Sequence, residues 1–252
     1  VKIYTYVSSG WDKFQTLKTE RDSEIKIGYS VELSQDGRTL AVGGQYRNVN
    51  GRGIVKFYHN NGSQWKEEED QMLVDINKYF GSSISLSSDG KRVAIGNQRK
   101  LSLNIFEQNV VNSNFIQIFD LDNGQWKKVG SNIDGLTASL SPDGKFVAIG
   151  QPFNSDNVGE TQVYRITNTE QSKVGHTIKG NKSDDLFGIS VSMAFDEGYR
   201  ISIGAYGGGE SSFASVYELV RDSTWVKIGQ HVYSNEDEKI VTKVTSLASN
   251  GN

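Results

Sequence analysis

The sequence has no cysteine, two prolines, three histidines and no long apolar run. Without cysteine there is no disulfide framework, no thiolate catalysis and no cysteine-ligated metal, although this does not decide the cellular compartment. No apolar stretch approaches the roughly 18 residues that a membrane-spanning helix needs. The 27 glycines, against two prolines, are typical of many tight turns between short strands.

Charge of neither sign dominates, because 27 Lys and Arg face 30 Asp and Glu. No strong field therefore attracts nucleic acid or an acidic membrane surface. We predict no nucleic-acid partner and no membrane insertion in this segment. The chain opens at Val1 inside an apolar pattern, which we interpret as a processed or excerpted form whose targeting signals cannot be consulted.

One hairpin pattern organises what is present. Phe80–Gly96 reads FGSSISLSSDGKRVAIG, with two alternating apolar runs around an Asp-Gly turn, a strong β-hairpin signal. The pattern returns at Tyr29–Gly43, Leu136–Gly150 and Ile189–Gly204, and half of it at Val244–Gly251. The turn glycines are spaced by 53, 54, 54 and 53 residues: Gly37, Gly90, Gly144, Gly198 and Gly251. This is a repeat of about 53 residues.

Each repeat divides into four strands. After the two strands of the hairpin comes a variable loop, a third strand ending at an aromatic residue, and a fourth strand that begins at a landmark position. The landmark residues are Trp11, Trp65, Trp126, Gln171 and Trp225. Four-stranded units at this spacing predict an all-β fold, a β-propeller of four-stranded antiparallel blades. We predict one domain over 1–252, with units at about 1–17 (partial), 24–73, 79–133, 134–179, 186–233 and 240–252 (partial).

The two partial units bear on function. One interpretation is a five-bladed ring with four complete units and a last blade split between the termini and lacking one strand. The other is an excerpt of a longer repeat chain. Either leaves an unpaired strand edge that another chain could extend, and we assign this assembly edge to Val1, Tyr6, Val244 and Leu247.

The repeats resemble the FG-GAP-like repeats of integrin-α-type propellers. The copy that carries the likeness best runs from Lys173 to Tyr217, with GNKSDDLFGISVSM, then ISIGA, then SVY. The chain is similar to related repeats common in surface and secreted proteins of microbes and algae. That resemblance implies a propeller with an extracellular or cell-surface location.

The chain departs from integrin-type repeats at the calcium loop. That loop supplies several carboxylates between the first and second strands, whereas the turns here hold one or two. One or two carboxylates cannot supply six to eight oxygen ligands, so we predict plain turns, no metal site and no cofactor. Asp120-Leu121-Asp122-Asn123-Gly124 has better spacing, but it falls in a hairpin and is also interpreted as a turn.

Candidate ligand-binding residues collect in the loops. Asp184 and Asp185 lie between a fourth strand and the next first strand, where propellers often bind ligands. Tyr46, Arg52, Phe153 and Tyr206 lie in the loops after second strands, and loops on rigid scaffolds are where binding residues gather. The three histidines fall in separate units, so no catalytic cluster is expected. The alternative is that these loops only cap the blades.

Two N-glycosylation sequons begin at Asn61 and Asn181, both in predicted turns, which makes the chain a candidate glycoprotein. The leading hypothesis is a non-enzymatic extracellular module for structure, adhesion or assembly, with a protein partner that is a second copy or another surface protein. The second is a lectin-type propeller that binds carbohydrate or protein ligands. The third is a glycoside hydrolase or lyase that uses the loop carboxylates.

Overall fold

The computed structural model describes residues 1–18, 25–46, 52–68, 71, 73–75, 79–97, 114–154, 156–207, 212–221 and 223–233. Its named elements are all strands. Within those ranges, no helix is both long enough and apolar enough to cross a membrane.

The strands form one hairpin and four larger antiparallel sheets, which we call the N-terminal hairpin and blades 1 to 4. The hairpin is β1 (Lys2–Val7) and β2 (Gly10–Thr16). Blade 1 is β3 (Ile25–Leu33), β4 (Thr39–Tyr46), β5 (Gly53–Asn60), β6 (Trp65–Glu67) and β7 (Leu73–Asp75). Blade 2 is β8 (Ser83–Leu86), β9 (Arg92–Gly96), β10 (Phe115–Asp122) and β11 (Gln125–Asp134). Blade 3 is β12 (Thr137–Leu140), β13 (Phe146–Gln151), β14 (Glu160–Ile166) and β15 (Gln171–Lys179). Blade 4 is β16 (Ser190–Phe195), β17 (Tyr199–Ala205), β18 (Phe213–Val220) and β19 (Thr224–Tyr233).

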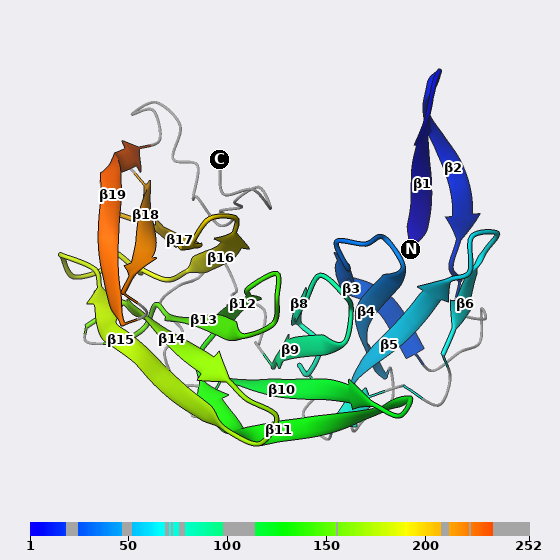
Figure 1. The fold of residues 1–252 in the computed structure, drawn as a ribbon, viewed down its shortest axis with the longest axis horizontal. Helices are drawn as coiled ribbons and strands as arrows, with labels where there is room; N and C mark the ends of the chain where they lie inside the picture. The colour runs from blue at the N-terminus through cyan, green and yellow to red at the C-terminus, as the bar shows by residue number, and fades with distance from the viewer. Residues whose placement is uncertain are drawn as a thin grey trace.

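The blades follow one another around an arc (Figure 1). The first strands β3, β8, β12 and β16 lie side by side in that order on the inside, and β11, β15 and β19 neighbour one another on the outside. This is the arrangement of blades in a β-propeller. The prediction of an all-β fold of four-stranded antiparallel sheets is confirmed, while the number of blades stays a prediction.

Blade 1 differs from the other three at its outer strand. Both β6 and β7 pair with β5, β6 near Asn60 and β7 near Gly53, so the fourth strand is present in two pieces. The sheet therefore counts five strands by pairing, although its plan is that of the other blades.

The Ser-x-Asp-Gly turns explain why the repeat keeps those residues. In blade 2 the Ser87 hydroxyl donates to Asp89 Oδ1 at 2.7 Å and accepts the backbone N–H of Arg92 at 2.9 Å. The same bonds close the turns at Ser34 and Ser141. At the first of these turns, the bond from Ser34 holds the pKa of Asp36 below its usual value. The carboxylate of each turn thus accepts hydrogen bonds from residues of the same turn.

Successive blades are joined by hydrogen bonds between their first strands. The Ser85 hydroxyl accepts the backbone N–H of Leu140, and the Ser139 hydroxyl accepts that of Met193, both at 3.0 Å. Glu32 occupies the same place in blade 1, and its carboxylate accepts the N–H of Leu86. Burial raises the pKa of Glu32 to about 7, because a buried carboxylate loses the hydration that favours its charged form.

The core fills the spaces between blades. One cluster joins blades 3 and 4 around Phe187, Ile201 and Ile203, and another joins blades 2 and 3 around Ile116, Ile118 and Ile149. These side chains are at most 1% exposed. Each blade therefore buries both of its faces only where it has a neighbour on both sides.

Candidate functional site

The structure brings several of the predicted loop residues together. Asp185 is buried, and its Oδ2 accepts the backbone N–H groups of Asn181 and Lys182 at 3.1 and 2.9 Å. Its own carbonyl oxygen accepts the N–H of Tyr206 at 2.6 Å. Asp184 is exposed, and its Oδ1 accepts from the Asn157 side-chain amide at 2.9 Å. Asp185 thus closes its own loop, which leaves Asp184 as the exposed carboxylate.

Phe153 and Arg52 do not join this group in any contact that the structure describes, whereas Tyr206 joins it through its backbone N–H. Phe153 is 39% exposed in the turn after β13, and Arg52 is exposed just before β5. Tyr206 is half-buried against an apolar cluster that contains Leu136 and Ile189. The side chain of Tyr46, and Val244 and Leu247, lie outside the described residues.

The histidines stay apart along the chain, on β5, β15 and β19. His231 Nδ1 lies 2.6 Å from the hydroxyl of Ser215, which is fully buried. The equivalent pair in blade 3 is Gln162 with Thr177, joined at 2.7 Å. Because the repeat builds a polar pair at this place in both blades, the contact of Ser215 with His231 is structural.

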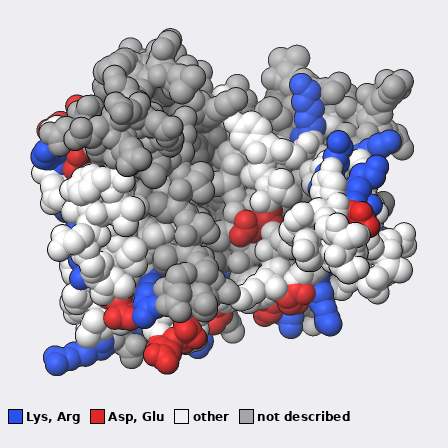
Figure 2. All heavy atoms as spheres, turned by 90° about the horizontal axis from the view of Figure 1, so that it is seen from above, with Lys and Arg blue, Asp and Glu red and all other residues white. Residues whose placement is uncertain are grey.

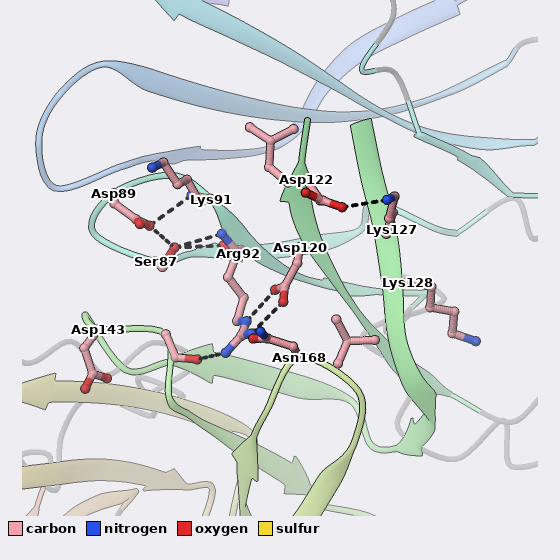
Figure 3. Close-up of a pocket in the computed structure, with 13 residues that line it drawn as sticks. Ser87, Asp89, Lys91, Arg92, Asp120, Asp122, Lys127, Lys128, Asp143 and Asn168 are labelled. Atoms are coloured by element: carbon pink, nitrogen blue, oxygen red, sulfur yellow. Dashed lines mark hydrogen bonds and ion pairs between the residues drawn. The ribbon is translucent and has the colours of Figure 1, made fainter. Parts of the chain in front are cut away.

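A pocket of about 530 Å³ opens between blades 2 and 3, where the hairpin turns of both blades meet (Figure 3). Its floor is Arg92 of β9, whose guanidinium forms two parallel bonds to Asp120 of β10 at 2.5 and 2.6 Å. The same guanidinium donates to the Gly144 carbonyl oxygen of blade 3 at 2.6 Å. A bidentate pair of this kind fixes both side chains, so the floor is rigid.

The rim of the pocket is open and polar. Lys127 donates to Asp122 at 2.6 Å, and both side chains are more than half exposed. Asp89 and Lys91 lie on the side of the blade 2 turn, Asn168 stands opposite them, and Lys128 points away from Arg92 (Figure 3). An exposed pair of this kind is worth only about 0–1 kcal/mol, so a ligand could open it.

The charges of the side chains that line the pocket balance one another. Its lining holds four cationic and four acidic side chains, Lys91, Arg92, Lys127 and Lys128 against Asp89, Asp120, Asp122 and Asp143. In Figure 2 the charged side chains lie mainly toward the edges of the face seen there, and both signs occur side by side along the lower edge. The lining therefore offers both cationic groups and carboxylate acceptors.

Sequence reasoning missed this pocket. Arg92 looks like an ordinary edge residue of a second strand, and nothing local marks it as the partner of Asp120, 28 positions away. The one usable signal was Asp120-Leu121-Asp122-Asn123-Gly124, and the structure shows it as the predicted turn between β10 and β11, with positive φ at Asn123 and Gly124. Among the residues described, no group of three or more metal-ligating side chains gathers.

Comparisons with known proteins identify a fold. No family model matches the sequence, and no curated protein matches it. Two similar solved structures are described as putative 6-phosphogluconolactonases, from Bacteroides uniformis (14% identity, TM-score 0.54) and Bacteroides fragilis (12%, 0.54). Each likeness covers 93% of this chain and 65% of the other. The β-propeller domain of the Trilobed protease from Pyrococcus furiosus is also similar (12%, TM-score 0.48, covering 82% and 58%).

These findings correct the functional prediction. The chain was predicted to be a structural, adhesion or assembly module, with lectin and glycosidase alternatives, yet two similar structures are described as putative 6-phosphogluconolactonases. The prediction failed because it inferred the function from the repeat pattern, and proteins with the same fold have many unrelated activities. The chain spans 65% of the length of the two lactonase-named structures.

Proposed function

We propose that this chain is a small-molecule-binding propeller that takes a polar anionic ligand, such as a phosphorylated sugar acid, between blades 2 and 3. The observation that supports this best is the pocket itself, with the exposed Asp122–Lys127 pair above the rigid Arg92–Asp120 floor. Its volume of about 530 Å³ falls in the range of known ligand pockets, about 300–1,000 Å³.

The chemistry of the rim suits that ligand class. An anionic group would replace Asp122 as the partner of Lys127, because little free energy is lost when an exposed ion pair opens. Hydroxyl groups of the ligand would then donate to the carboxylates of Asp122 and Asp89. Two similar structures are described as putative 6-phosphogluconolactonases, and a lactone of a phosphorylated sugar acid carries both kinds of group.

We expect binding without turnover, in line with the prediction that the chain is not an enzyme. The pocket lining contains no histidine or cysteine. Its serine, Ser87, donates its hydroxyl proton to Asp89 and closes the turn, so it is not poised as a nucleophile. We therefore propose that the pocket binds this class of ligand without catalysing its reaction.

The test is calorimetric titration of the protein with 6-phosphogluconate, with Lys127→Gln as the variant. Loss of the charged partner should weaken binding about tenfold or more. Lys173→Gln removes an exposed lysine from blade 3 outside the pocket and should leave the affinity unchanged. Equal affinity in wild type and Lys127→Gln, or no binding at millimolar concentrations, would overturn the proposed site.

A hydrolysis assay separates binding from catalysis. We expect 6-phosphogluconolactone to open no faster with the protein than without it. Faster opening that Asp122→Asn abolishes would make the chain an enzyme at the same pocket and would refute binding without turnover.

The finer assignments from sequence belong to the same proposal. We propose that the repeats are of the FG-GAP-like type and that the protein is extracellular or on the cell surface. The repeated FG or IG pair, the Asp-Gly turn and the VAIG strand support the first, and the two exposed sequons support the second.

A further inference from the structure

The outer sides of three junctions follow one plan: the N-terminal hairpin with blade 1, blade 2 with blade 3, and blade 3 with blade 4. In each case the landmark residue of a blade contacts the outer strand that precedes it in the arc. The residue that it contacts stands four positions after the landmark residue of that outer strand. A Cβ on Gly130 would stand 2.7 Å from the Gln171 carboxamide, and one on Gly175 would stand 2.9 Å from the Trp225 ring. At the first junction Gln15 takes the glycine's place and bonds both the N–H and the carbonyl of Trp65.

Apolar residues flank this contact and are buried by the following blade. In blade 2 they are Val129 and Ile133, at 2% and 6% exposure. In blade 3 they are Val174 and Ile178, at 7% and 4%. Ile133 packs in the cluster that blades 2 and 3 share, and Ile178 in the cluster that blades 3 and 4 share.

Blade 4 carries the same positions without a following blade in the described part of the chain. They are Ile228, Gly229 and Val232, which we call the blade 4 socket. Val232 is 68% exposed, although its counterparts Ile133 and Ile178 are buried. No described atom lies within 4 Å of a Cβ placed on Gly229.

We infer that the blade 4 socket binds the outer hairpin of a further blade of the same repeat type, through an aromatic residue at the start of that hairpin's second strand. The inference continues an interface that the chain already forms between its own blades. Such a contact buries the landmark side chain almost fully, because Trp225, which packs against blade 3, is only 2% exposed. The inference is independent of the proposed ligand pocket.

The partner hairpin comes from outside the described arc. Trp11 is the chain's one exposed landmark tryptophan, at 69% exposure, but it stands on the N-terminal hairpin at the opposite end of the arc from β19 (Figure 1). The lactonase-named structures are longer than this chain, which spans 65% of each, and a propeller of their length has room for further blades.

The test uses the full chain and a backbone-cyclised peptide with the sequence of residues 115–134, which is the β10–β11 hairpin with its landmark Trp126. Calorimetry should show binding, and Val232→Asp in the protein should weaken it at least tenfold. Val232 is exposed, so this variant should unfold at the same temperature as wild type. Val31→Asp changes another exposed valine, 48% exposed on β3 of blade 1, and should bind like wild type.

The peptide has its own control, because replacing its tryptophan by alanine should weaken binding at least tenfold. Binding that Val232→Asp leaves unchanged, or no binding at millimolar peptide, would overturn the inference. Analytical sedimentation tests for self-association of the chain. In the alternative outcome the wild-type chain self-associates, and both Val232→Asp and Trp11→Ser abolish that association. That result would make the occupant a second copy and would overturn the partner stated here.

Discussion

A Cβ atom on Gly43 would stand 2.0 Å from the carbonyl oxygen of Gly81, so blades 1 and 2 meet backbone to backbone. Gly150 and Gly188 repeat the relationship between blades 3 and 4, at 2.1 Å. The hydroxyls of Ser30 and Thr137 donate to the same two carbonyl oxygens. This contact explains the second glycine of the hairpins in blades 1 and 3, six residues after the turn glycine.

Gly150→Ala should therefore destabilise the protein strongly. The added methyl group would collide with backbone atoms that cannot move without separating two blades. We expect the free energy of unfolding to fall by about 3 kcal/mol, at the upper end for overpacked sites. Urea denaturation measures it, with Gly198→Ala as the control, because the nearest atom to its Cβ lies 3.5 Å away and is the end of a side chain. Equal losses in the two variants would contradict the close approach.

Glu32 should make stability depend on pH. Its pKa is raised by burial from 4.5 to about 7, so between these values the folded state keeps a proton that the unfolded state releases. The free energy of unfolding then decreases as pH rises from about 4.5 to about 7. Glu32→Gln keeps an acceptor for the Leu86 N–H and should be more stable than wild type at pH 8 by about 1–3 kcal/mol.

Denaturation curves from pH 4 to 8 test this, and Glu170→Gln provides an exposed glutamate as control. The difference between Glu32→Gln and wild type should vanish near pH 4. A difference that is constant across the range would show that the carboxylate titrates normally.

Ser85→Ala should weaken the junction between blades 2 and 3. The hydroxyl accepts the backbone N–H of Leu140 in a buried place, and alanine leaves that donor without an acceptor. We expect a loss of about 1–2 kcal/mol. Ser63→Ala, in an exposed turn, should change the free energy of unfolding by less than about 0.5 kcal/mol. If the two variants lose equal stability, the bond between blades contributes nothing.

Arg92→Gln should be costly because it leaves Asp120 without its partner and removes the bond to Gly144. The two side chains are 14% and 23% exposed, so we expect a loss of about 2–4 kcal/mol. Lys127→Gln breaks the exposed pair with Asp122 and should cost at most about 1 kcal/mol. The double variant Arg92→Gln with Asp120→Asn should recover part of the loss, and no recovery would mean that the pair is not the cause.

Expression in a secreting eukaryotic host should attach glycans at Asn61 and Asn181, because both side chains are exposed in turns. In the first turn Oδ1 of the Asn61 side chain accepts the backbone N–H groups of Ser63 and Gln64, which leaves the side-chain amide nitrogen accessible. Mass spectrometry before and after glycan removal measures occupancy, and Asn61→Gln and Asn181→Gln each remove one site. Unmodified asparagines in secreted protein would contradict the prediction.

The sequence by itself determined the strands, the turns and the repeat. Alternating apolar residues set the faces of each strand, the Ser-x-Asp-Gly turns form by local bonds such as that from Ser87 to Asp89, and the second glycine marks a close approach. These features depend on neighbours within a few residues or on the pattern of burial, so they could be read along the chain. The sequence also placed Asp184, Asp185 and Tyr206 in loops, and the structure joins Asp185 to Tyr206 through a backbone hydrogen bond.

Only the tertiary structure decided which side chains work together and which faces stay open. Arg92 meets Asp120 and Gly144 because two blades bring their turns to one place, and Asp185 is buried because its own loop folds around it. Val232 is exposed and Ile178 is buried, although the repeat gives them the same position. The reason is physical, because a residue's burial in a propeller depends on the next blade, and neither the composition nor the local pattern of a strand records that neighbour.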